Sequence, residues 1–406
     1  MDIRIEPRRL SGAVTPPPSK SLAHRLLLCA ALAEGESSLH NIELSEDIEA
    51  TLRCVKALGA EVTRAGRSLR VAGVGAKAPA GAPPLFDCGE SGSTLRFLLP
   101  VALAVCGGGD FTGRGRLMQR PLGPYETLFR EQGIAFECEG DTLRVRGTLR
   151  PGRCALPGDV SSQFFTGLLL ALPLLDAPSA VEATTPPESA DYIELTRRAQ
   201  LAAGVESRAE DGRFTVRPQR YRAFEAAVEA DWSQAAFWLA ASGLGGAVRV
   251  KGLDPRSAQG DRRFAAFARL LAGGGDRTID VRDCPDLVPP LAALAAVRAG
   301  RCRLEGAARL RLKESDRLAT VSAALNALGA DVREEPEALE IRGVPSLRGG
   351  AALDCAGDHR IAMMCAVAAT RCEKSVVLRG ADCVNKSYPS FWEEYRRLGG
   401  CIHVLD

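Results

Sequence analysis

The stretch Ala57-Leu58-Gly59-Ala60-Glu61-Val62 carries the signature that decides the fold: the end of a helix-like segment, a glycine step and the start of a strand. Five further copies occur at spacings of roughly 55 to 75 residues, and a period of that size is typical of a repeated structural unit. These copies are Gln132-Gly133-Ile134, Ala203-Gly204-Val205, Ala272-Gly273-Gly274, Leu328-Gly329-Ala330-Asp331-Val332 and Leu398-Gly399-Gly400. The chain is therefore expected to contain one α+β unit six times.

Each copy is expected to form an apolar strand, an amphipathic helix, the glycine step and two strands joined by a polar turn. Residues 62–74 illustrate the strand pair, because apolar and polar residues alternate on both sides of the turn Ala65-Gly66-Arg67-Ser68. The step glycine fits the position just after a helix, where a positive φ angle is needed. Glu46-Asp47 and Ser315-Asp316 fit helix N-caps.

Two similar halves are expected, because three copies precede about residue 228 and three follow it. We place the first domain at residues 19–230 and the second at residues 1–18 plus 231–406, with one cleft between them. The chain would cross at Pro16-Pro17-Pro18 and again at Glu229-Ala230-Asp231. The glycine- and proline-rich tract 75–84 predicts a surface loop.

The composition indicates an enzyme of the cytoplasm. The 406 residues are 46% hydrophobic and carry a net charge of +2 without long charged runs, which argues against nucleic-acid and membrane-surface partners. The 13 cysteines contain no Cys-x-x-Cys pair, so reduced, packed thiols are expected rather than a disulfide or zinc site. Neither a signal peptide nor an apolar run long enough to span a membrane is recognisable.

Polar and charged residues recur where the repeated helices are expected to begin. Counting back thirteen residues from the step glycine reaches Arg120, Asp191, Asp316 and Lys386 in four copies. Because helix N-termini present unpaired N–H groups and a positive dipole end, they attract anions. The repeat therefore predicts an anionic ligand.

Two clusters add charge at such helix starts. Lys20, Ser21 and Arg25 lie within about a turn and a half, which suits a phosphate or carboxylate but also fits a solvated helix start. In Lys313-Glu314-Ser315-Asp316-Arg317, two cations flank a carboxylate. This second cluster fits an exposed face with weak ion pairs equally well, or an anion site with a proton donor beside it.

Three further segments have the chemistry of a binding site. Asp358-His359-Arg360 precedes an apolar helix, and Arg360 is its sharper candidate because a lone histidine is more often structural. Ser161-Ser162-Gln163 offers two hydroxyls and an amide, and Gly92 allows close approach of a ligand. Neither of these last two segments has the spacing of a P-loop or a dinucleotide fingerprint, so nucleotide binding is disfavoured.

The motifs occur in a fixed order along the whole chain: Lys20-Ser21-x-x-x-Arg25, the Gly92 loop, Arg120-Pro121, Ser161-Ser162-Gln163, Ser189-x-x-Tyr192, Pro285-Asp286, Lys313-Glu314-x-Asp316-Arg317, Asp358-His359-Arg360 and Lys386-Ser387-Tyr388-Pro389. Together they resemble the EPSP synthase (3-phosphoshikimate 1-carboxyvinyltransferase) family. The order and spacing of the whole set make the resemblance specific.

The resemblance implies two domains, each with three βαβαββ units around a pseudo-threefold axis, and an active site in the interdomain cleft. It implies transfer of the enolpyruvyl group of phosphoenolpyruvate to the 5-hydroxyl of shikimate 3-phosphate, with release of phosphate, in the shikimate pathway of aromatic amino-acid biosynthesis. It further implies small-molecule substrates and no metal or organic cofactor. A monomer is expected, because a closed two-domain active site requires only one chain.

The resemblance also assigns roles to residues. It implies Glu314 as the acid and Asp286 with Lys20 as the basic side of the reaction. Residues implied for shikimate 3-phosphate are Lys20, Ser21, Arg25, Ser161, Ser162, Gln163, Ser189, Tyr192, Asp286 and Lys313. Residues implied for phosphoenolpyruvate are Lys20, Gly92, Arg120, Gln163, Glu314, Arg317, Arg360 and Lys386.

Four positions depart from the family pattern: Glu90 for Asn, Ser93 for Thr, Phe97 for Pro, and Arg309 for an Asn that helps hold the substrate phosphate. These four residues bear on the affinity for phosphoenolpyruvate and its mimic glyphosate.

Two alternative functions stay open. A transferase acting on a UDP-amino sugar would be expected to have Lys-Asn at positions 20 and 21, and a non-catalytic domain would be expected to have lost Glu314 or Lys20.

Overall fold

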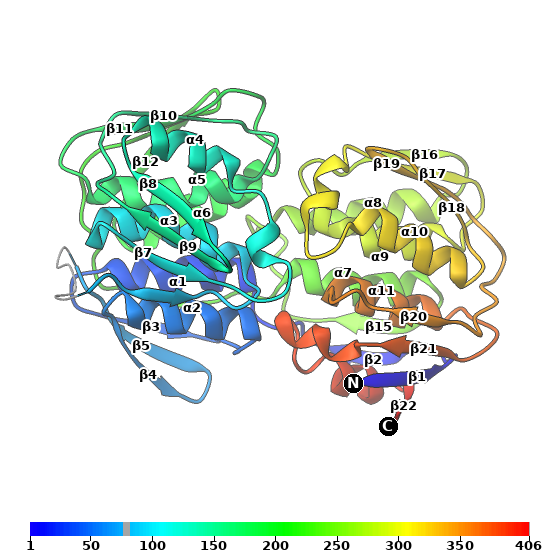
Figure 1. Ribbon diagram of the computed structural model, residues 1–406. Helices are drawn as coiled ribbons and strands as arrows, with labels where there is room; N and C mark the ends of the chain where they lie inside the picture. The colour runs from blue at the N-terminus through cyan, green and yellow to red at the C-terminus, as the bar shows by residue number, and fades with distance from the viewer. Residues whose placement is uncertain (76–81, 406) are drawn as a thin grey trace. The chain divides into compact units, whose positions relative to one another are not determined.

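The computed structural model describes residues 1–75 and 82–405, so residues 76–81 of the loop expected at 75–84 lie outside the described part. The chain divides into two compact units (Figure 1). The contiguous unit consists of Pro18–Glu229, and the split unit consists of Met1–Pro17 together with Ala230–Asp406. Within the described residues, no helix combines the length and the apolar character needed to cross a membrane.

Three four-stranded sheets form the outer layers of the contiguous unit, in the orders β14-β3-β5-β4, β6-β7-β9-β8 and β10-β11-β13-β12. Each sheet has one parallel pair followed by two antiparallel pairs. The strands are β3 (Glu36–His40), β4 (Glu61–Ala65), β5 (Ser68–Ala72), β6 (Leu85–Asp87), β7 (Gly108–Thr112), β8 (Ala135–Glu139), β9 (Thr142–Arg146), β10 (Arg153–Leu156), β11 (Ser179–Ala183), β12 (Ser207–Glu210), β13 (Arg213–Val216) and β14 (Glu225–Ala227).

Six helices cover the inner faces of these sheets. They are α1 (Lys20–Leu32), α2 (Glu46–Ala57), α3 (Gly92–Cys106), α4 (Gly123–Glu131), α5 (Ser162–Ala171) and α6 (Ala190–Ala202). Helices α1, α3 and α5 are buried along most of their length, because their sequences are apolar on nearly every side. A helix of this kind is stable only in a core, and α3 packs against α5.

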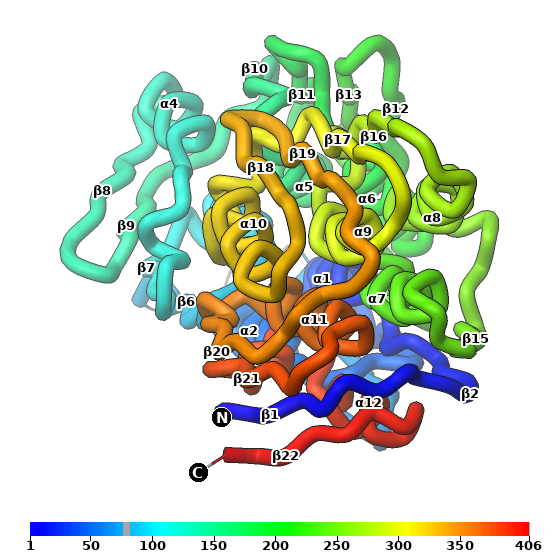
Figure 2. Tube along the Cα trace, turned by 90° about the vertical axis from the view of Figure 1, so that its right-hand side faces the viewer, coloured from blue at the N-terminus to red at the C-terminus, as the bar shows by residue number. Residues whose placement is uncertain are grey.

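The split unit repeats this plan with two four-stranded sheets, β16-β17-β19-β18 and β20-β21-β1-β22, and a two-stranded sheet, β15-β2. Figure 2 shows the N-terminal strand β1 between β21 and β22. The strands are β1 (Asp2–Glu6), β2 (Ser11–Val14), β15 (Ala247–Val250), β16 (Arg277–Asp280), β17 (Arg301–Glu305), β18 (Asp331–Glu334), β19 (Ala338–Arg342), β20 (Ala352–Asp354), β21 (Val376–Arg379) and β22 (Cys401–Leu405).

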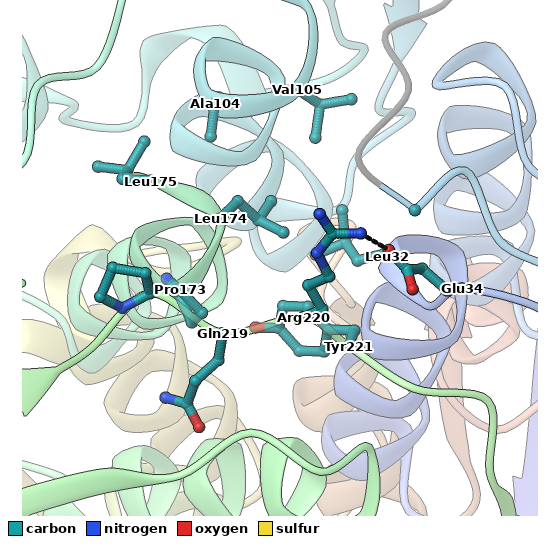
Figure 3. Close-up of a pocket in the computed structure, with 12 residues that line it drawn as sticks. Leu32, Glu34, Ala104, Val105, Pro173, Leu174, Leu175, Gln219, Arg220 and Tyr221 are labelled. Carbon is teal, nitrogen blue, oxygen red and sulfur yellow. Dashed lines mark hydrogen bonds and ion pairs between the residues drawn. The ribbon is translucent and has the colours of Figure 1, made fainter. Parts of the chain in front are cut away.

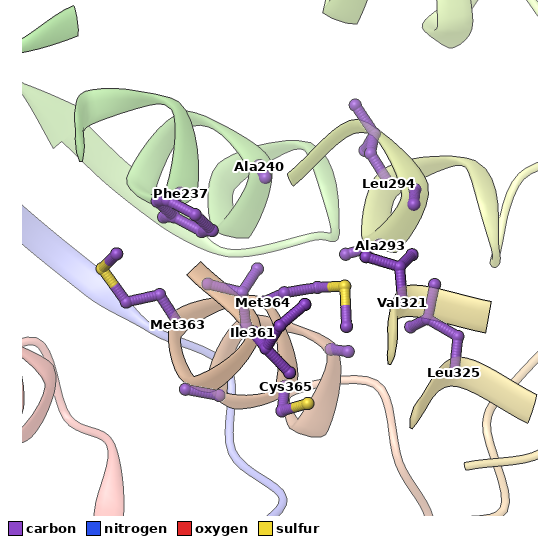
Figure 4. Close-up of a cluster of buried hydrophobic side chains, with 14 of the residues drawn as sticks. Phe237, Ala240, Ala293, Leu294, Val321, Leu325, Ile361, Met363, Met364 and Cys365 are labelled. Atoms are coloured by element: carbon purple, nitrogen blue, oxygen red, sulfur yellow. The ribbon is translucent and has the colours of Figure 1, made fainter. Parts of the chain in front are cut away.

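The core of the split unit is also helical. Its helices are α7 (Trp232–Gly243), α8 (Phe264–Ala272), α9 (Val288–Ala295), α10 (Arg317–Ala327), α11 (His359–Ala369) and α12 (Phe391–Arg397). Figure 4 shows Met364 of α11 reaching toward Ala293 of α9 and Val321 of α10, with Phe237 of α7 on the other side of the cluster. The strictly apolar face of α11 is therefore the centre of this core.

The glycine steps behave as expected in five of the six copies. Each of these glycines follows a helix C-cap and has a φ angle between 76° and 108°, as in Gly133 and Gly59. In the fourth copy, Gly273 is itself the C-cap, with φ of −72°, and the positive φ of 64° falls on Gly274. A glycine with a left-handed (positive φ) conformation therefore follows the helix in all six copies. In the fourth copy it lies one residue later than expected.

Several details of the expected repeat are wrong. Arg120 and Lys386 are not helix starts, because Arg120 follows the 3-10 helix Leu117–Gln119 and precedes α4, and Lys386 ends the 3-10 helix Ala381–Lys386 and precedes α12. The fourth and sixth copies form no strand pair of their own. After Gly274 the chain enters β16, the first strand of the following sheet, and after Gly399 it enters the single strand β22, which pairs with β1. The N-cap of α2 is Ser45, whose hydroxyl accepts a hydrogen bond from the Ile48 N–H, whereas Glu46 and Asp47 lie in the first turn. The expected cap at Asp316 is confirmed, since its carboxylate accepts a hydrogen bond from the Ala319 N–H.

Candidate active site

The helix starts of the contiguous unit carry most of the candidate residues of that unit. Lys20 opens α1, Gly92 opens α3, and Ser162 opens α5. Each helix is capped by the serine just before it, at positions 19, 91 and 161, whose hydroxyl accepts a backbone N–H. One free N–H of each first turn is thereby satisfied, and the others remain directed along the helix axis, as at an anion site.

Lys20 is held by a carboxylate from the next helix. Its Nζ lies 2.5 Å from Oδ2 of Asp47, and both side chains are largely buried. Asp47 belongs to the first turn of α2, so this ion pair ties the starts of α1 and α2. Asp47 was not among the candidate site residues. The available signal in the sequence was its position beside an expected helix start.

Arg25 is a buried cation without a carboxylate partner among the described residues. Its guanidinium donates to the Thr196 hydroxyl at 2.8 Å and to the backbone carbonyls of Ser21 and Tyr192 at 2.6 and 3.1 Å. Burial lowers the pKa of Arg25 to about 10. A positive charge held in this way, by neutral acceptors alone, gains most from an anionic ligand.

Two aromatic rings offset part of the free-energy cost of burying that charge. The Arg25 guanidinium carbon lies 5.0 Å from the ring centre of Phe97 and 5.9 Å from that of Tyr192, within the range of cation–π attraction. Phe97 is one of the four departures from the family pattern. The structure gives it a physical role, because it packs in α3 against the cation of α1.

Arg120 lies directly against Gly92. A Cβ atom built on Gly92 would lie 2.6 Å from Nη1 and 2.9 Å from Cζ of Arg120, which is too close for real atoms. Gly92 has an ordinary helical place at the first position of α3, so its role is spatial rather than conformational. The bare backbone makes room for the Arg120 guanidinium.

Gln163 is oriented by α3. Its amide nitrogen donates to the Ser93 hydroxyl at 3.0 Å, and its carbonyl oxygen accepts from Nη1 of Arg96 at 2.7 Å. Arg96 also donates to the carbonyl of Pro121, next to Arg120. Ser93, a departure from the family pattern, therefore retains the hydroxyl that fixes Gln163. Arg96 was missed, and its place inside an apolar helix was the available signal.

Ser189 adopts a strained backbone. It is 2% exposed and has φ of 57°, the left-handed region that residues other than glycine rarely adopt. It lies just before α6, and its carbonyl accepts a hydrogen bond from the Tyr192 N–H. Strain of this kind persists only where the surroundings impose it, which fits a residue placed for function.

In the split unit, the candidates gather around Arg317. Its guanidinium donates to Oδ1 of Asp286 at 2.7 Å, to Oε2 of Glu314 at 2.6 Å, and to both oxygens of Asp358 at 2.7 and 3.2 Å. Burial lowers its pKa, but these three carboxylates outweigh burial and raise it. Arg317 is 1% exposed. It therefore fixes three acidic groups that are far apart in the sequence.

Asp286, in the 3-10 helix Pro285–Leu287, is shared by three cations. It meets Arg317 at 2.7 Å, Arg360 at 3.0 Å and Lys313 at 3.7 Å. Burial raises the pKa of Asp286, yet Arg360, Lys313 and Arg317 together bring it well below its usual range. The three cations therefore favour the charged form of the Asp286 carboxylate.

Arg360 and Lys386 complete this cluster. Arg360 donates to the Ser233 hydroxyl at 2.7 Å as well as to Asp286, and its backbone N–H donates to Asp358, the N-cap of α11. Lys386, at the end of the 3-10 helix Ala381–Lys386, donates to the carbonyl of Gly357 at 2.7 Å. The chain at Gly357 and Asp358 therefore contacts both cations.

Lys313 is a cation of the cluster whose pKa is lowered. Burial lowers its pKa to about 8, Asp286 opposes the shift, and Arg317 reinforces it. Its side chain is 25% exposed. Arg309, another departure from the family pattern, is buried nearby in the 3-10 helix Ala308–Leu312 and donates to the carbonyl of Arg282 at 2.6 Å.

Asp261 is a second buried carboxylate beside Asp286. Burial raises its pKa to about 6, the Asp286 charge adds to the shift, and Arg360 opposes it. It lies in the 3-10 helix Gly260–Arg263 and is 3% exposed. Two neighbouring carboxyls with pKa values driven in opposite directions are typical of acid–base sites. Asp261 was missed, because no motif in the sequence marks it.

A cavity of about 330 Å³ lies away from these residues. It is lined by the ends of helices rather than their starts, with Leu32 at the end of α1 and Val105 near the end of α3. Figure 3 shows Tyr221 and Leu174 inside it, and the ion pair between Arg220 and Glu34 at 2.6 Å. No residue of the candidate site lines this cavity.

Each expected site residue thus lies in one of two clusters. The contiguous-unit cluster comprises Lys20, Ser21, Arg25, Gly92, Arg120, Ser161, Ser162, Gln163, Ser189 and Tyr192. The split-unit cluster comprises Asp286, Lys313, Glu314, Arg317, Arg360 and Lys386. Ion pairs connect five members of the split-unit cluster into one network, and Lys386 donates to the carbonyl of Gly357. Most members of the other cluster lie at helix starts.

Comparison with known proteins gives consistent matches over the whole chain. The family described as EPSP synthase (3-phosphoshikimate 1-carboxyvinyltransferase) matches residues 5–273 and 274–395. The 3-phosphoshikimate 1-carboxyvinyltransferase of Clostridium kluyveri is 42% identical, covering 98% of both chains. That of Clostridium acetobutylicum is 39% identical, covering 99% of this chain and 98% of the relative. The solved EPSP synthase of Acinetobacter baumannii has a TM-score of 0.80 at 25% identity, covering 100% of both chains.

The repeated fold and these full-length matches define the chain as a transferase enzyme. It belongs to the EPSP synthase (3-phosphoshikimate 1-carboxyvinyltransferase) family.

Proposed function

We propose that this chain transfers the enolpyruvyl group of phosphoenolpyruvate to the 5-hydroxyl of shikimate 3-phosphate, giving 5-enolpyruvylshikimate 3-phosphate and phosphate. The observation that carries the proposal is the pair of cation-rich clusters, most of whose members lie at or near helix starts, in a member of this family. Both substrates are anions with phosphate and carboxylate groups. Lysine and arginine at helix N-termini are suited to such groups.

The substrates divide between the clusters by chemistry. Shikimate 3-phosphate binds Arg25, whose buried charge has only neutral partners among the described residues, with Lys20, Ser21, Ser161, Ser162, Gln163, Ser189, Tyr192, Asp286 and Lys313 around it. Phosphoenolpyruvate binds Lys20, Gly92, Arg120, Gln163, Glu314, Arg317, Arg360 and Lys386. Members of both clusters serve each ligand, so the proposal requires the two units to act together.

The chemistry needs an acid and a base. Glu314 delivers a proton to the methylene carbon of phosphoenolpyruvate, and the neighbouring carbon gains cationic character. Asp286 with Lys20 relieves the attacking 5-hydroxyl of its proton, and addition gives a tetrahedral intermediate. Loss of phosphate then reverses the proton transfers. Binding of anions to Lys313 and Arg360 weakens their hold on Asp286 and raises its basicity.

The alternatives are not favoured. The clostridial relatives share the name 3-phosphoshikimate 1-carboxyvinyltransferase, and the solved relative is an EPSP synthase rather than a UDP-sugar transferase. Lys20 and Glu314 are both present, which argues against a non-catalytic domain.

We propose a monomer of the cytoplasm acting on small molecules without a cofactor. The thirteen free cysteines fit a reducing compartment, and one chain supplies both clusters.

The direct test is a phosphate-release assay with product identification by mass spectrometry. Phosphate is expected only when both shikimate 3-phosphate and phosphoenolpyruvate are present, together with a product heavier than shikimate 3-phosphate by the enolpyruvyl group. Replacement of shikimate 3-phosphate by UDP-N-acetylglucosamine should give no phosphate. Release with the nucleotide sugar instead would contradict the proposal.

Gly92→Ala is expected to weaken glyphosate and phosphoenolpyruvate more than shikimate 3-phosphate. The added methyl group would lie 2.6 Å from Nη1 of Arg120, so the guanidinium must move out of the place where it meets the smaller anion. Calorimetric titrations of the three ligands measure this difference. Gly123→Ala is the control, because a Cβ there meets nothing within 4 Å. Equal losses for all three ligands would show that the loop does not serve this subsite.

Lys313 predicts a pH dependence of shikimate 3-phosphate affinity. Its lowered pKa means that the positive charge is present below about pH 8 and is lost as the pH rises through that value. Affinity should therefore fall above about pH 8, by up to about tenfold per pH unit. Lys313→Arg should remove this dependence, because arginine stays charged. Titrations between about pH 7 and about pH 9.5 check it, and the same fall in Lys313→Arg would exclude Lys313 as the cause.

A further inference from the structure

A continuous chain of four buried side chains joins three helices of the contiguous unit. Nδ1 of His24 lies 2.6 Å from the Thr51 hydroxyl, which lies 2.7 Å from the Thr94 hydroxyl. The Thr94 hydroxyl donates to the Ser91 hydroxyl at 2.7 Å. His24 belongs to α1, Thr51 to α2 and Thr94 to α3, and each of the four residues is at most 1% exposed.

The direction of the protons in this chain follows from counting donors. Thr94 has one hydroxyl proton, which goes to Ser91, so Thr94 must accept from Thr51. Thr51 then uses its proton on Thr94 and must accept from His24. His24 is therefore the neutral tautomer with its proton on Nδ1. The Asp47 carbonyl, 3.3 Å from the Thr51 hydroxyl, competes for the same proton, but the Thr94 hydroxyl is much closer at 2.7 Å. The shorter contact therefore keeps the sequence of donors from His24 to Ser91.

The surroundings of His24 agree with this tautomer. Its Nε2 is buried and has no hydrogen-bond partner among the described residues, so a proton there would be left unsatisfied. Burial, and then the charges of Lys20 and Arg25, hold the pKa of His24 well below its usual range. The Phe97 ring packs edge-on against the imidazole at 6.5 Å. The lowered pKa and the hydrogen-bond chain both favour the neutral His24 ring as a donor to Thr51.

The chain connects the places where the candidate cations are held. His24 lies between Lys20 and Arg25 on α1, and Thr51 is one turn after Asp47, the partner of Lys20. At the other end, Ser91 caps α3 through the Thr94 N–H at 3.2 Å and directly precedes Gly92. Displacement of any link would move the start of α3 relative to Lys20.

We propose that His24, Thr51 and Thr94 are positioning residues that set the start of α3, with Gly92, at the correct place relative to Lys20 for phosphoenolpyruvate. None of the three touches the ligand in this scheme. They act through the cap at Ser91 and through the Lys20–Asp47 pair. The expected effect on the KM for phosphoenolpyruvate rests on the proposed function. The positioning of the start of α3 depends only on the hydrogen bonds described above.

Thr51→Val is the decisive variant, because valine keeps the shape of threonine and removes the hydroxyl in the middle of the chain. The KM for phosphoenolpyruvate should rise about 2- to 30-fold, the range for a residue that acts on a site through packed neighbours without touching the ligand, while kcat and the KM for shikimate 3-phosphate change much less. Thr51→Ser restores the hydroxyl and should return the KM to near the parent value. Amide hydrogen exchange should accelerate in the first turn of α3 in Thr51→Val only.

His40→Gln is the matched control. His40 makes the same type of contact, from Nδ1 to the Ser68 hydroxyl at 3.0 Å, in the same unit, but on β3 and away from the helix starts. It should leave both KM values unchanged. A loss of stability in Thr51→Val without a change in KM or in exchange at α3 would overturn the inference and leave the chain a packing feature.

A measurement on the parent protein keeps the inference testable if Thr51→Val does not fold. Nitrogen-15 NMR of the imidazole should find His24 neutral with its proton on Nδ1 throughout the neutral pH range. A charged ring, or a proton on Nε2, would break the donor sequence and overturn the inference. If the parent protein releases no phosphate, the proposed function fails, whereas the NMR and exchange results still decide whether the chain sets the position of α3.

Discussion

Glu314→Gln is expected to lower turnover by at least about 100-fold while leaving ligand affinity largely intact, as for loss of a general acid. Glutamine has nearly the size of glutamate and still offers an oxygen to Arg317, whose Nη2 donates to Glu314 Oε2 at 2.6 Å. It has no titratable proton to deliver to the methylene carbon. Steady-state kinetics with both substrates, together with calorimetric affinities, measure the effect.

Glu194→Gln is the matched control for this prediction. Glu194 pairs with Arg197 at 2.5 Å with the same spacing of three residues along the chain, but it belongs to neither cluster. Turnover of this control should be unchanged. Near-normal turnover in Glu314→Gln would remove Glu314 from the proton-transfer role, and Asp261, whose pKa is raised to about 6, would be the next acid to examine.

Arg25→Met is expected to weaken shikimate 3-phosphate by about 30- to 5,000-fold, which corresponds to the 2 to 5 kcal/mol lost when one partner of a buried charge pair is truncated. The unfolding temperature should fall little. In the absence of ligand, burial of this charge is compensated only by hydroxyls, carbonyls and two aromatic rings among the described residues. Calorimetry and thermal unfolding separate the two effects.

Arg197→Met provides the control. Arg197 makes a similar set of hydrogen bonds, to the hydroxyl and carbonyl of Ser207, and has Glu194 as a carboxylate partner. Its loss should leave affinity for shikimate 3-phosphate unchanged. Equal affinities in Arg25→Met and the parent would show that the buried charge serves the fold alone.

Much of the fold could be predicted, because its repeat depends on local chemistry. A glycine such as Gly133 after a helix has a distinct backbone requirement, and this requirement recurs at the expected spacing. The fourth copy differs from the expectation, because a glycine pair does not show which member takes the left-handed conformation. The cap of α2 differs because Ser45, Glu46 and Asp47 all have side chains that suit a helix start.

The site was predictable only where charge and motif coincide in the sequence. Lys313, Glu314 and Arg317 are neighbours in the chain, so their cluster was visible at once. Asp358 meets Arg317 from 41 positions away, and its pairing with that guanidinium depends on tertiary packing. The cation–π contact of Phe97 with Arg25 is equally non-local. Its departure from the family pattern showed that position 97 differs, but not which residue the ring would contact.

The central claim is that the two clusters, one in each unit, serve a single pair of ligands. The measurement that tests it most directly is calorimetric titration of phosphoenolpyruvate or glyphosate with and without shikimate 3-phosphate. Affinity is expected to rise about 5- to 150-fold in the presence of shikimate 3-phosphate. Small-angle scattering should show compaction as the units move about the crossings near Pro18 and Ala230. Identical affinities and an unchanged radius would contradict the claim.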